Sequence, residues 1–378
     1  MKHIFILFLS ILLANTSIAQ IVITEKGKSE SRIILPTNDS IDMKAAYLFQ
    51  DFIHRISGVK IPIIHGNTTI KNNDIIIGNK DPDDKEITED GFRITTEAQK
   101  INIVSGGGYG SVYAIVTILE KYLGVGYWGE YEYTYQHDES ITIPPVNIIE
   151  NPAFHYRQSQ NYALTSDTIY KLWNRLKSPE EVFAGGYWGH TFDKLLPSAV
   201  YGKEHPEYYS FFNGKRHPGK ASQWCLTNPD VLEIVANRID SIFKANPDKH
   251  IISISQNDGN YTYCQCNKCK AIDDYEEAHS GSLIHFINKL SERFPDKEIS
   301  TLAYLYTMKP PKYVKPRSNV NIMLCSIDSD REVSLTENES GREFVEALEG
   351  WSRISDNLFI WDYGINFDNY LVPFPKFH

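Results

Sequence analysis

The sequence of 378 residues predicts an α/β protein in which a small α/β accessory domain precedes a (β/α)8 TIM-type barrel. Two observations predict this class. As far as about Val146, short apolar runs alternate with stretches that have helical spacing. After a stretch that carries several prolines, strand and helix patterns recur as units, which favours a parallel sheet and, over this length, a barrel. A doubly wound open sheet is the structural alternative.

The first residues predict export. Lys2 and His3 give a cationic start, and an apolar run follows that is short for a membrane span, IFILFLSILLA. Small residues at Ser17 and Ala19 suit signal-peptidase cleavage after Ala19. We therefore expect residues 1–19 to be a signal peptide and the protein to be periplasmic, at the cell surface or extracellular. An uncleaved anchor helix is the alternative.

Composition limits the expected partners. The net charge is −10, and no run of Lys or Arg lies on an aromatic-rich face, which disfavours nucleic acids. The 23 tyrosines suit stacking on the apolar faces of sugars, but they equally suit a core. No segment after the N-terminal run is apolar enough to cross a membrane. Composition alone does not decide for a glycan, but it leads us to expect no nucleic acid and no membrane span.

The accessory domain is expected over residues 20–148. A helix is predicted over Asp42–Ser57 with Gly58 as its stop, and a second follows the glycine run at 106–110 and ends at Gly124. That run lacks the Lys-Ser/Thr ending of a phosphate-binding loop, so a tight turn is the favoured interpretation. The expected strands are Ile33–Leu35, Ile61–Ile64, Asp74–Gly78 and a hairpin of Phe92–Ile94 with Lys100–Val104.

The barrel domain is expected over residues 149–378, after a linker between Ile143 and Pro152. The predicted helices are Pro229–Phe243, with Asn228 as N-cap, Ser282–Phe294 and Glu343–Ile354. The predicted strands are Phe154–Tyr162, Ser222–Thr227, Ile251–Asp258, Ile299–Tyr306, Val320–Asp328 and Leu358–Tyr363. The pattern ends before the last unit of an eight-stranded barrel, so we expect a barrel that is incomplete at the C-terminus.

Three predicted strands end on a carboxylate: Asp258, Asp328 and Asp362. In a parallel barrel these ends meet at one rim, and hydrolysis of an acetal needs two carboxyl groups there. We therefore expect all three to be catalytic, against the alternative of helix caps or loop hydrogen bonds. The expected substrate-binding residues are Asn257, Trp188, His190, Trp224, Tyr304, Tyr306, Trp361 and Tyr363.

The five cysteines leave two possibilities open. Cys264, Cys266 and Cys269 form a C-x-C-x-x-C cluster after the strand of Asp258, and Cys225 and Cys325 complete the set. The cluster plus a distant Cys or His could supply the four ligands of structural zinc. Disulfides are the alternative in an exported protein. No catalytic metal and no cofactor are expected.

A family resemblance rests on several separate motifs. From Asn151 onward the motifs include WGHTFDKLLP, CLTNPDV, SISQNDG, CQCNKCKA, LAYLYTMKPP and LFIWDY. These resemble domain-of-unknown-function family 4838, part of which is glycoside hydrolase family 163, with endo-β-N-acetylglucosaminidases that cut complex N-glycans. The N-terminal motifs AYLFQDFIHRISG and GSVYAIVTILEKYLG resemble the accessory domain that precedes β-hexosaminidase and α-glucuronidase barrels.

The resemblance implies a glycoside hydrolase that acts on β-linked N-acetylglucosamine in N-glycan-type substrates. A retaining mechanism is expected, in which the acetamido oxygen attacks, one carboxylate orients it and another donates the proton. Asp258 and Asp328 are the expected pair, with their roles open; the family has Glu at the place of Asp328. The alternatives are an α-glucuronidase-like glycosidase, with Asp328 or Asp362 as base, and a non-catalytic carbohydrate-binding protein.

Overall fold

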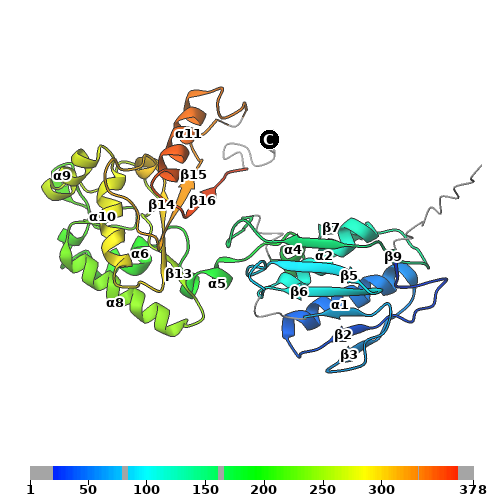
Figure 1. Cartoon of the computed structure of the whole chain (residues 1–378). Helices are drawn as coiled ribbons and strands as arrows, with labels where there is room; N and C mark the ends of the chain where they lie inside the picture. The colour runs from blue at the N-terminus through cyan, green and yellow to red at the C-terminus, as the bar shows by residue number, and fades with distance from the viewer. Residues whose placement is uncertain (1–19, 79–83, 161–165, 331, 365–378) are drawn as a thin grey trace, which may run out of the picture. The chain divides into compact units, whose positions relative to one another are not determined.

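The protein is described here from a computed structural model that covers residues 20–78, 84–160, 166–330 and 332–364 (Figure 1). The chain divides into two compact units, the first ending at Lys177 and the second beginning at Ser178. The predicted signal peptide, residues 1–19, lies outside the described residues. In the part of the chain that is described, no helix is both long and apolar enough to span a membrane.

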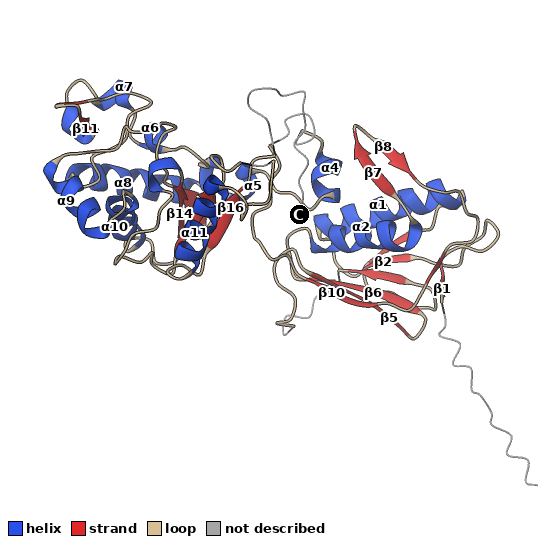
Figure 2. Ribbon diagram, turned by 90° about the horizontal axis from the view of Figure 1, so that it is seen from above, coloured by secondary structure: helices blue, strands red, loops and turns tan. Residues whose placement is uncertain are grey.

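The first unit is built on a six-stranded mixed sheet in the order β10-β5-β6-β4-β2-β3. The pairs β2–β3, β2–β4 and β4–β6 are parallel, whereas β5 is antiparallel to both β6 and β10. Helices α1 and α2 pack on one face of this sheet (Figure 2). The sheet strands are β2 (Ile33–Leu35), β3 (Ile63–His65), β4 (Ile75–Ile77), β5 (Phe92–Glu97), β6 (Lys100–Ser105) and β10 (Asn147–Glu150). The other elements of this unit are α1 (Ser40–Ser57), α2 (Gly110–Leu123), α4 (Thr168–Trp173), β1 (Ile21–Val22), β7 (Gly126–Gly129), β8 (Glu132–Thr134) and β9 (Thr142–Ile143).

Helix α1 shows why the accessory part folds as the pattern predicts. The Asp39 side chain accepts hydrogen bonds from the backbone N–H groups of Ile41 and Asp42, which caps the first turn. Gly58 ends the helix with φ 76°, a conformation that glycine adopts without strain. The apolar stripe between these caps is buried against the sheet. The predicted helix is confirmed, as is the second one.

The glycine run before α2 forms the predicted tight turn. Gly108 has φ 51°, and a Cβ atom built there would lie 2.1 Å from Oδ1 of Asp90. The same carboxylate oxygen accepts a hydrogen bond of 2.9 Å from the N–H of Tyr109, at the start of the helix. An anionic side chain of the protein itself therefore holds this turn.

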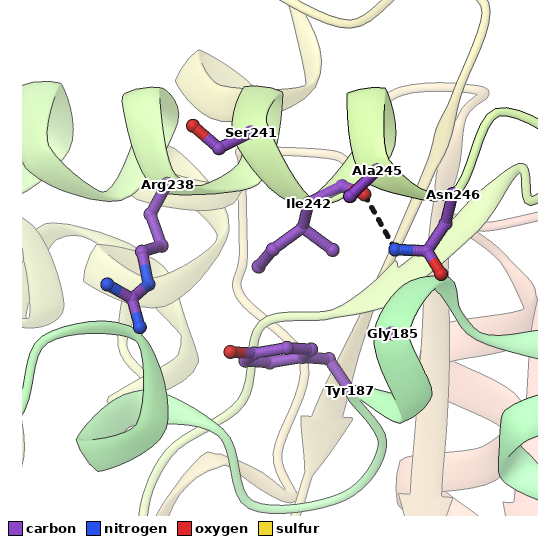
Figure 3. Close-up of a pocket in the computed structure, with 7 residues that line it drawn as sticks. All are labelled: Gly185, Tyr187, Arg238, Ser241, Ile242, Ala245 and Asn246. Atoms are coloured by element: carbon purple, nitrogen blue, oxygen red, sulfur yellow. Dashed lines mark hydrogen bonds between the residues drawn. The ribbon is translucent and has the colours of Figure 1, made fainter.

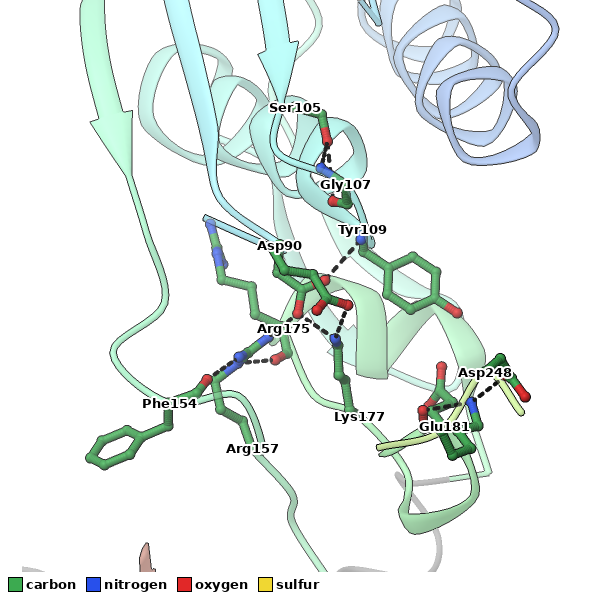
Figure 4. A network of polar contacts seen from close by, with 12 residues as sticks. Asp90, Ser105, Gly107, Tyr109, Phe154, Arg157, Arg175, Lys177, Glu181 and Asp248 are labelled. Atoms are coloured by element: carbon green, nitrogen blue, oxygen red, sulfur yellow. Dashed lines mark hydrogen bonds and ion pairs between the residues drawn. The ribbon is translucent and has the colours of Figure 1, made fainter. Parts of the chain in front are cut away.

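The first unit extends beyond the predicted boundary at residue 148. The carboxylate of Asp90 is 3% exposed and pairs with Arg157 at 3.2 Å and with Lys177 at 2.5 Å (Figure 4). Trp173 is buried in the core of the first unit. The prediction of a linker between Ile143 and Pro152 is also wrong, because this stretch contains β10, which pairs with β5. The packing of Arg157, Trp173 and Lys177 on the first unit is the reason for the later boundary.

The second unit contains a parallel four-stranded sheet in the order β13-β14-β15-β16. All six residues of β15 are buried, as expected for a strand covered on both faces. The strands are β13 (Ile251–Ser253), β14 (Glu298–Ala303), β15 (Val320–Cys325) and β16 (Leu358–Trp361), with a separate ribbon of β11 (Phe211–Phe212) and β12 (Lys215–Arg216). The four corresponding strands are confirmed, but each ends two to five residues earlier than predicted. The predicted strands Phe154–Tyr162 and Ser222–Thr227 are wrong: the first has no strand in its described residues, and the second has only one bridge, between Tyr209 and Trp224.

The order of the strands bears on the choice between barrel and open sheet. Strands that are adjacent in sequence are adjacent in the sheet, and residues 183–191 continue the series beside β13 through a parallel bridge between Phe183 and Ile251. A doubly wound sheet reverses its order at a switch point, which these residues do not show. The α/β class is confirmed. The described residues do not close a barrel, so closure stays a prediction.

Helices cover the sheet of the second unit, with α10 on β14 and β15 (Figure 1). The Asn228 side chain accepts a hydrogen bond from the N–H of Asp230 and Pro229 is the first residue of α8, which confirms the predicted cap. The long helices are α8 (Pro229–Ala245), α9 (Asn267–Glu276), α10 (Ser280–Ser291) and α11 (Glu339–Ser352), and the short ones are α5 (Pro179–Val182), α6 (Phe192–Leu195) and α7 (Ser198–Tyr201). Helix α9 was not predicted from the sequence.

Candidate functional site

The three predicted carboxylates lie at the carboxyl end of one parallel sheet. Asp258 follows β13, Asp328 follows β15 and Asp362 directly follows β16. All three side chains are exposed. Because parallel strands run in one direction, the residues that follow them meet at the same edge, where parallel α/β proteins bind ligands. We call this edge the rim.

Asp258 is bound to a tyrosine from the neighbouring strand. The hydroxyl of Tyr304, which directly follows β14, donates a hydrogen bond of 2.9 Å to Oδ1 of Asp258. Burial raises the pKa of Tyr304, and the hydrogen bond to Asp258 and the negative charges of Asp258 and Asp328 raise it further. Tyr304 therefore stays protonated and serves as a fixed donor to the carboxylate.

Asp362 has a local structural contact. Its Oδ1 accepts hydrogen bonds from the hydroxyl of Ser326 at 3.0 Å and from the N–H of Tyr363 at 2.8 Å. Ser326 directly follows β15, so the carboxylate joins the ends of two adjacent strands. The structure thus gives Asp362 a contact that supports the rim, whereas its predicted catalytic role stays untested.

Aromatic rings line the rim. The rings of Trp188 and Trp361 have centroids 4.6 Å apart, and Trp361 stacks on Tyr363 at 5.8 Å with an interplanar angle of 3°. His190 lies edge-on to Tyr304 at 5.4 Å and 6.5 Å from Trp361. We call these five side chains the aromatic cluster. Five of the predicted substrate-binding residues are therefore brought together.

The position of His190 is set by the end of β13. Its Nδ1 lies 2.6 Å from the backbone oxygen of Gln256. Because a carbonyl oxygen only accepts, Nδ1 carries the proton, and Nε2 of the neutral ring is then the acceptor. The imidazole can therefore accept a hydrogen bond from a hydroxyl group through Nε2.

Asn257, in contrast, is bound within the protein. Its side chain is 6% exposed, with Oδ1 accepting from the N–H of Asp193 at 2.9 Å and Nδ2 donating to the oxygen of Ser222 at 2.7 Å. The Gln223 amide bonds both the N–H and the C=O of Asn257, at 2.9 and 3.0 Å. These contacts fix the backbone before Asp258, and we assign Asn257 to positioning in place of the predicted contact with a sugar.

Two more predicted binding residues lie elsewhere. Trp224 is 1% exposed and stacks on Phe192 with centroids 3.7 Å apart, so it belongs to the core of the second unit. Tyr306 packs against Tyr263 at 5.3 Å and approaches His279 at 6.5 Å. Their aromatic character led to the prediction that both residues bind substrate. Trp224 is outside the aromatic cluster because it is buried in the core, and Tyr306 because it packs against other rings.

Residues that support the rim were missed as functional candidates. The Gln256 side chain is buried, and its Nε2 donates to the backbone oxygen of Tyr304 at 3.2 Å and to the hydroxyl of Thr307 at 2.7 Å. Gln256 and Gln223 thus hold the two strand ends around Asp258 and Tyr304. The signal available in the sequence was an amide side chain, Gln256, that directly precedes Asn257 near the end of the predicted strand.

Four cysteines form the one group of described residues with the arrangement of a metal site. Cys225 joins Cys264, Cys266 and Cys269, and their four sulfur atoms lie within 4.8 Å of one another. Cys325 is instead buried in β15. The fourth member, which the sequence left open, is thus Cys225.

The surface hollows of the two units are lined by residues other than those predicted for the site. In the second unit, a hollow of about 340 Å³ lies between α8 and residues 185–187, with Tyr187 and Ile242 on its walls (Figure 3). Asn246 closes one end by donating a hydrogen bond of 2.8 Å to the oxygen of Ile242. None of the predicted site residues lines it, so we place the candidate site at the rim.

Comparison with known proteins assigns the chain to a family. A family model described as a domain of unknown function, DUF4838, matches residues 127–378. No curated protein matches the chain.

Several solved structures are similar to the chain. The GH20 β-N-acetylhexosaminidase from Streptomyces coelicolor A3(2) is 9% identical, with 92% of this chain and 73% of that chain covered and a TM-score of 0.47. The β-N-acetylhexosaminidase from Bacteroides fragilis NCTC 9343 is 13% identical, with 93% and 76% covered and a TM-score of 0.49. At these identities and scores the similarity says nothing of activity.

Proposed function

The chain belongs to the DUF4838 family, and we propose that the rim of its second unit is the active site of a glycoside hydrolase. The single observation that carries the proposal is the meeting of Asp258, Tyr304 and Asp328 at the ends of three adjacent strands. Tyr304 binds one carboxylate directly, and the charge of the other acts on its hydroxyl. Two carboxyl groups around one site are what glycoside hydrolysis requires.

The contact of Tyr304 divides the roles. A hydroxyl that donates to Asp258 fixes the orientation of its carboxyl group, so we assign Asp258 to orienting or activating the attacking group. Asp328 then suits the acid that protonates the leaving oxygen. The two residues come from β13 and β15, and these strands lie about 10 Å apart at two strand spacings.

The aromatic cluster fits a sugar ring. Trp361 and Tyr363 are half-buried and present nearly parallel ring planes. Flat rings of this kind stack on the apolar face of a pyranose while their polar edges remain near water. His190 next to them offers an acceptor to a hydroxyl group. These features support a carbohydrate as the ligand.

For the substrate we propose β-linked N-acetylglucosamine in glycans of the N-glycan type, cleaved with retention. In this scheme the acetamido oxygen of the substrate attacks the anomeric carbon while Asp258 orients it, and water then releases the product. The proposal rests on the family resemblance and on the hydrogen bond from Tyr304 to Asp258. We also propose export after cleavage of residues 1–19, so that mass spectrometry of the protein from its own host should find Gln20 at the N-terminus.

The test compares variants of the whole chain on N-acetylglucosamine glycosides and on complex N-glycans, followed by mass spectrometry of the products. Asp258→Asn and Asp328→Asn should each lower turnover by about 10²–10⁴ with little change in affinity. Asp356→Asn is the matched control, because Asp356 is exposed and precedes β16 at the opposite end of the sheet. Turnover that survives in both rim variants would refute the assignment.

A carbohydrate-binding protein without activity is the second candidate, which the stacked rings of Trp361 and Tyr363 favour. Calorimetry with the same glycans separates the two. Binding without hydrolysis by the wild type would replace the enzyme proposal with this one. Hydrolysis of α-linked glucuronides in place of N-acetylglucosamine would keep the carboxylates and change the substrate to that of an α-glucuronidase.

A further inference from the structure

Four cysteines from two distant segments meet behind the loop that follows Asp258. Cys264 and Cys266 lie on that loop, Cys269 lies in the first turn of α9, and Cys225 follows Trp224 in another part of the chain. Three of the four are buried, with exposures of 5% for Cys264, 1% for Cys269 and 4% for Cys225. Four thiols rarely gather in a protein interior without a common ligand.

The distances fit a tetrahedron. All four sulfur atoms lie within 4.8 Å of one another, and those of Cys225 and Cys266 are 3.7 Å apart. Zinc holds thiolates at about 2.3 Å, so the sulfurs of a regular tetrahedral site lie about 3.8 Å apart. Two disulfides would instead divide the group into two pairs with sulfurs at about 2.05 Å. All four cysteines are free thiols in the structure.

Hydrogen-bond donors surround the sulfur atoms. The N–H of Phe211 lies 3.4 Å from the sulfur of Cys264, and Nη1 of Arg216 lies 3.6 Å from the same atom. The hydroxyl of Thr227 lies 3.3 Å from the sulfur of Cys269. Such donors stabilise thiolates that bind a metal, and a cation such as Arg216 offsets part of the net charge of −2 left by four thiolates and Zn²⁺.

From this geometry we infer that Cys225, Cys264, Cys266 and Cys269 bind one zinc ion. Four thiolates fill a tetrahedral shell and leave no position for water, which makes the site structural. The ion would join the loop after Asp258 and the start of α9 to the segment that leads into α8. Its effect on the rim is to hold the loop that follows Asp258, and the inference does not depend on the proposed function.

The primary test needs no variant. The whole chain is purified under reducing conditions without chelators, its zinc content is measured by elemental analysis, and its zinc environment by X-ray absorption. We expect about one zinc per chain with four sulfur neighbours at about 2.3 Å. Iron at the four thiolates, nitrogen or oxygen ligands around zinc, or a metal-free protein would each overturn the inference.

Variants then locate the ion. Cys225→Ser should lose the zinc, because it removes the ligand that is distant in sequence. Cys325→Ser is the matched control and should keep one zinc, since Cys325 is equally buried but lies in β15, outside the group. Titration of the apoprotein with Zn²⁺ alone should restore the lost content in the wild type and in Cys325→Ser. Loss of zinc from Cys325→Ser, or its retention in Cys225→Ser, would contradict the assignment.

Discussion

Replacing Asn257 by alanine tests whether this residue supports the rim or binds the substrate. The substitution removes the two side-chain hydrogen bonds to Asp193 and Ser222 and leaves the backbone bonds with Gln223 in place. The donor on Asp193 and the acceptor on Ser222 then lose their partner. A buried polar group left without one costs about 1–3 kcal/mol, so the pair gives about 2–6 kcal/mol.

The lower part of this range is the expected result. The N–H of Asp193 is only partly buried, so water can replace one of the two contacts. We therefore expect the free energy of unfolding to fall by about 2–3 kcal/mol, a factor of roughly 30–150 in the unfolding equilibrium at about 1.4 kcal/mol per tenfold.

The assay is urea denaturation of the whole chain followed by tryptophan fluorescence. Four of the six tryptophans lie in the second unit, so the signal reports mainly on it. Asn260→Ala is the control, because Asn260 is exposed in the same loop, and it should change stability by less than about 0.5 kcal/mol. An Asn257→Ala variant with wild-type stability and weakened glycan affinity would refute the positioning role and restore the predicted contact with the sugar.

Two further predictions concern packing and pH. Trp224→Ala should lower the free energy of unfolding by about 3–5 kcal/mol, the usual cost of emptying a buried tryptophan site, whereas Trp361→Ala should mainly weaken glycan binding. Urea denaturation measures the stability and calorimetry the binding. The reverse pattern would place Trp224 at the rim. Burial alone would raise the pKa of Glu276, but hydrogen bonds from the N–H groups of Val314 and Tyr313 and from His285 lower it below 4.5. The stability from Glu276 is therefore present above pH 4.5 and is lost as the pH falls through the lowered value. Glu276→Gln should be less stable at pH 7 and lose less than the wild type on acidification; parallel stability curves would show that this carboxylate has no such role.

The sequence predicted the elements whose signals are local. Asn228 and Pro229 mark the start of α8, and Gly58 marks the end of α1, because caps depend on a few neighbouring residues. The segment Ser222–Thr227 was wrongly predicted as a strand, since an apolar run indicates burial without specifying the backbone. Its Trp224 is buried by stacking on Phe192, a contact between distant parts of the chain.

In the candidate site, too, features with a local signal could be predicted and contacts between distant residues could not. The carboxylates could be predicted because each follows a strand, and parallel strands bring their ends together. The internal role of Asn257 could not, because its partners Asp193, Ser222 and Gln223 are remote in sequence. The same holds for Cys225, whose approach to the C-x-C-x-x-C cluster depends on the folded second unit.

The late boundary between the units has a consequence for synthesis on the ribosome. The core of the first unit is complete once Trp173 has emerged, since all its buried members precede that residue. The rim needs side chains from Trp188 to Tyr363, so its last strand arrives much later. At about 5–20 residues per second, the ribosome takes roughly 10–40 s more to reach Gly364. Only in the last part of this interval, after Cys325 has been made, do β13, β14 and β15 await β16. The exposed edge of β15 in that period is where misassembly would begin.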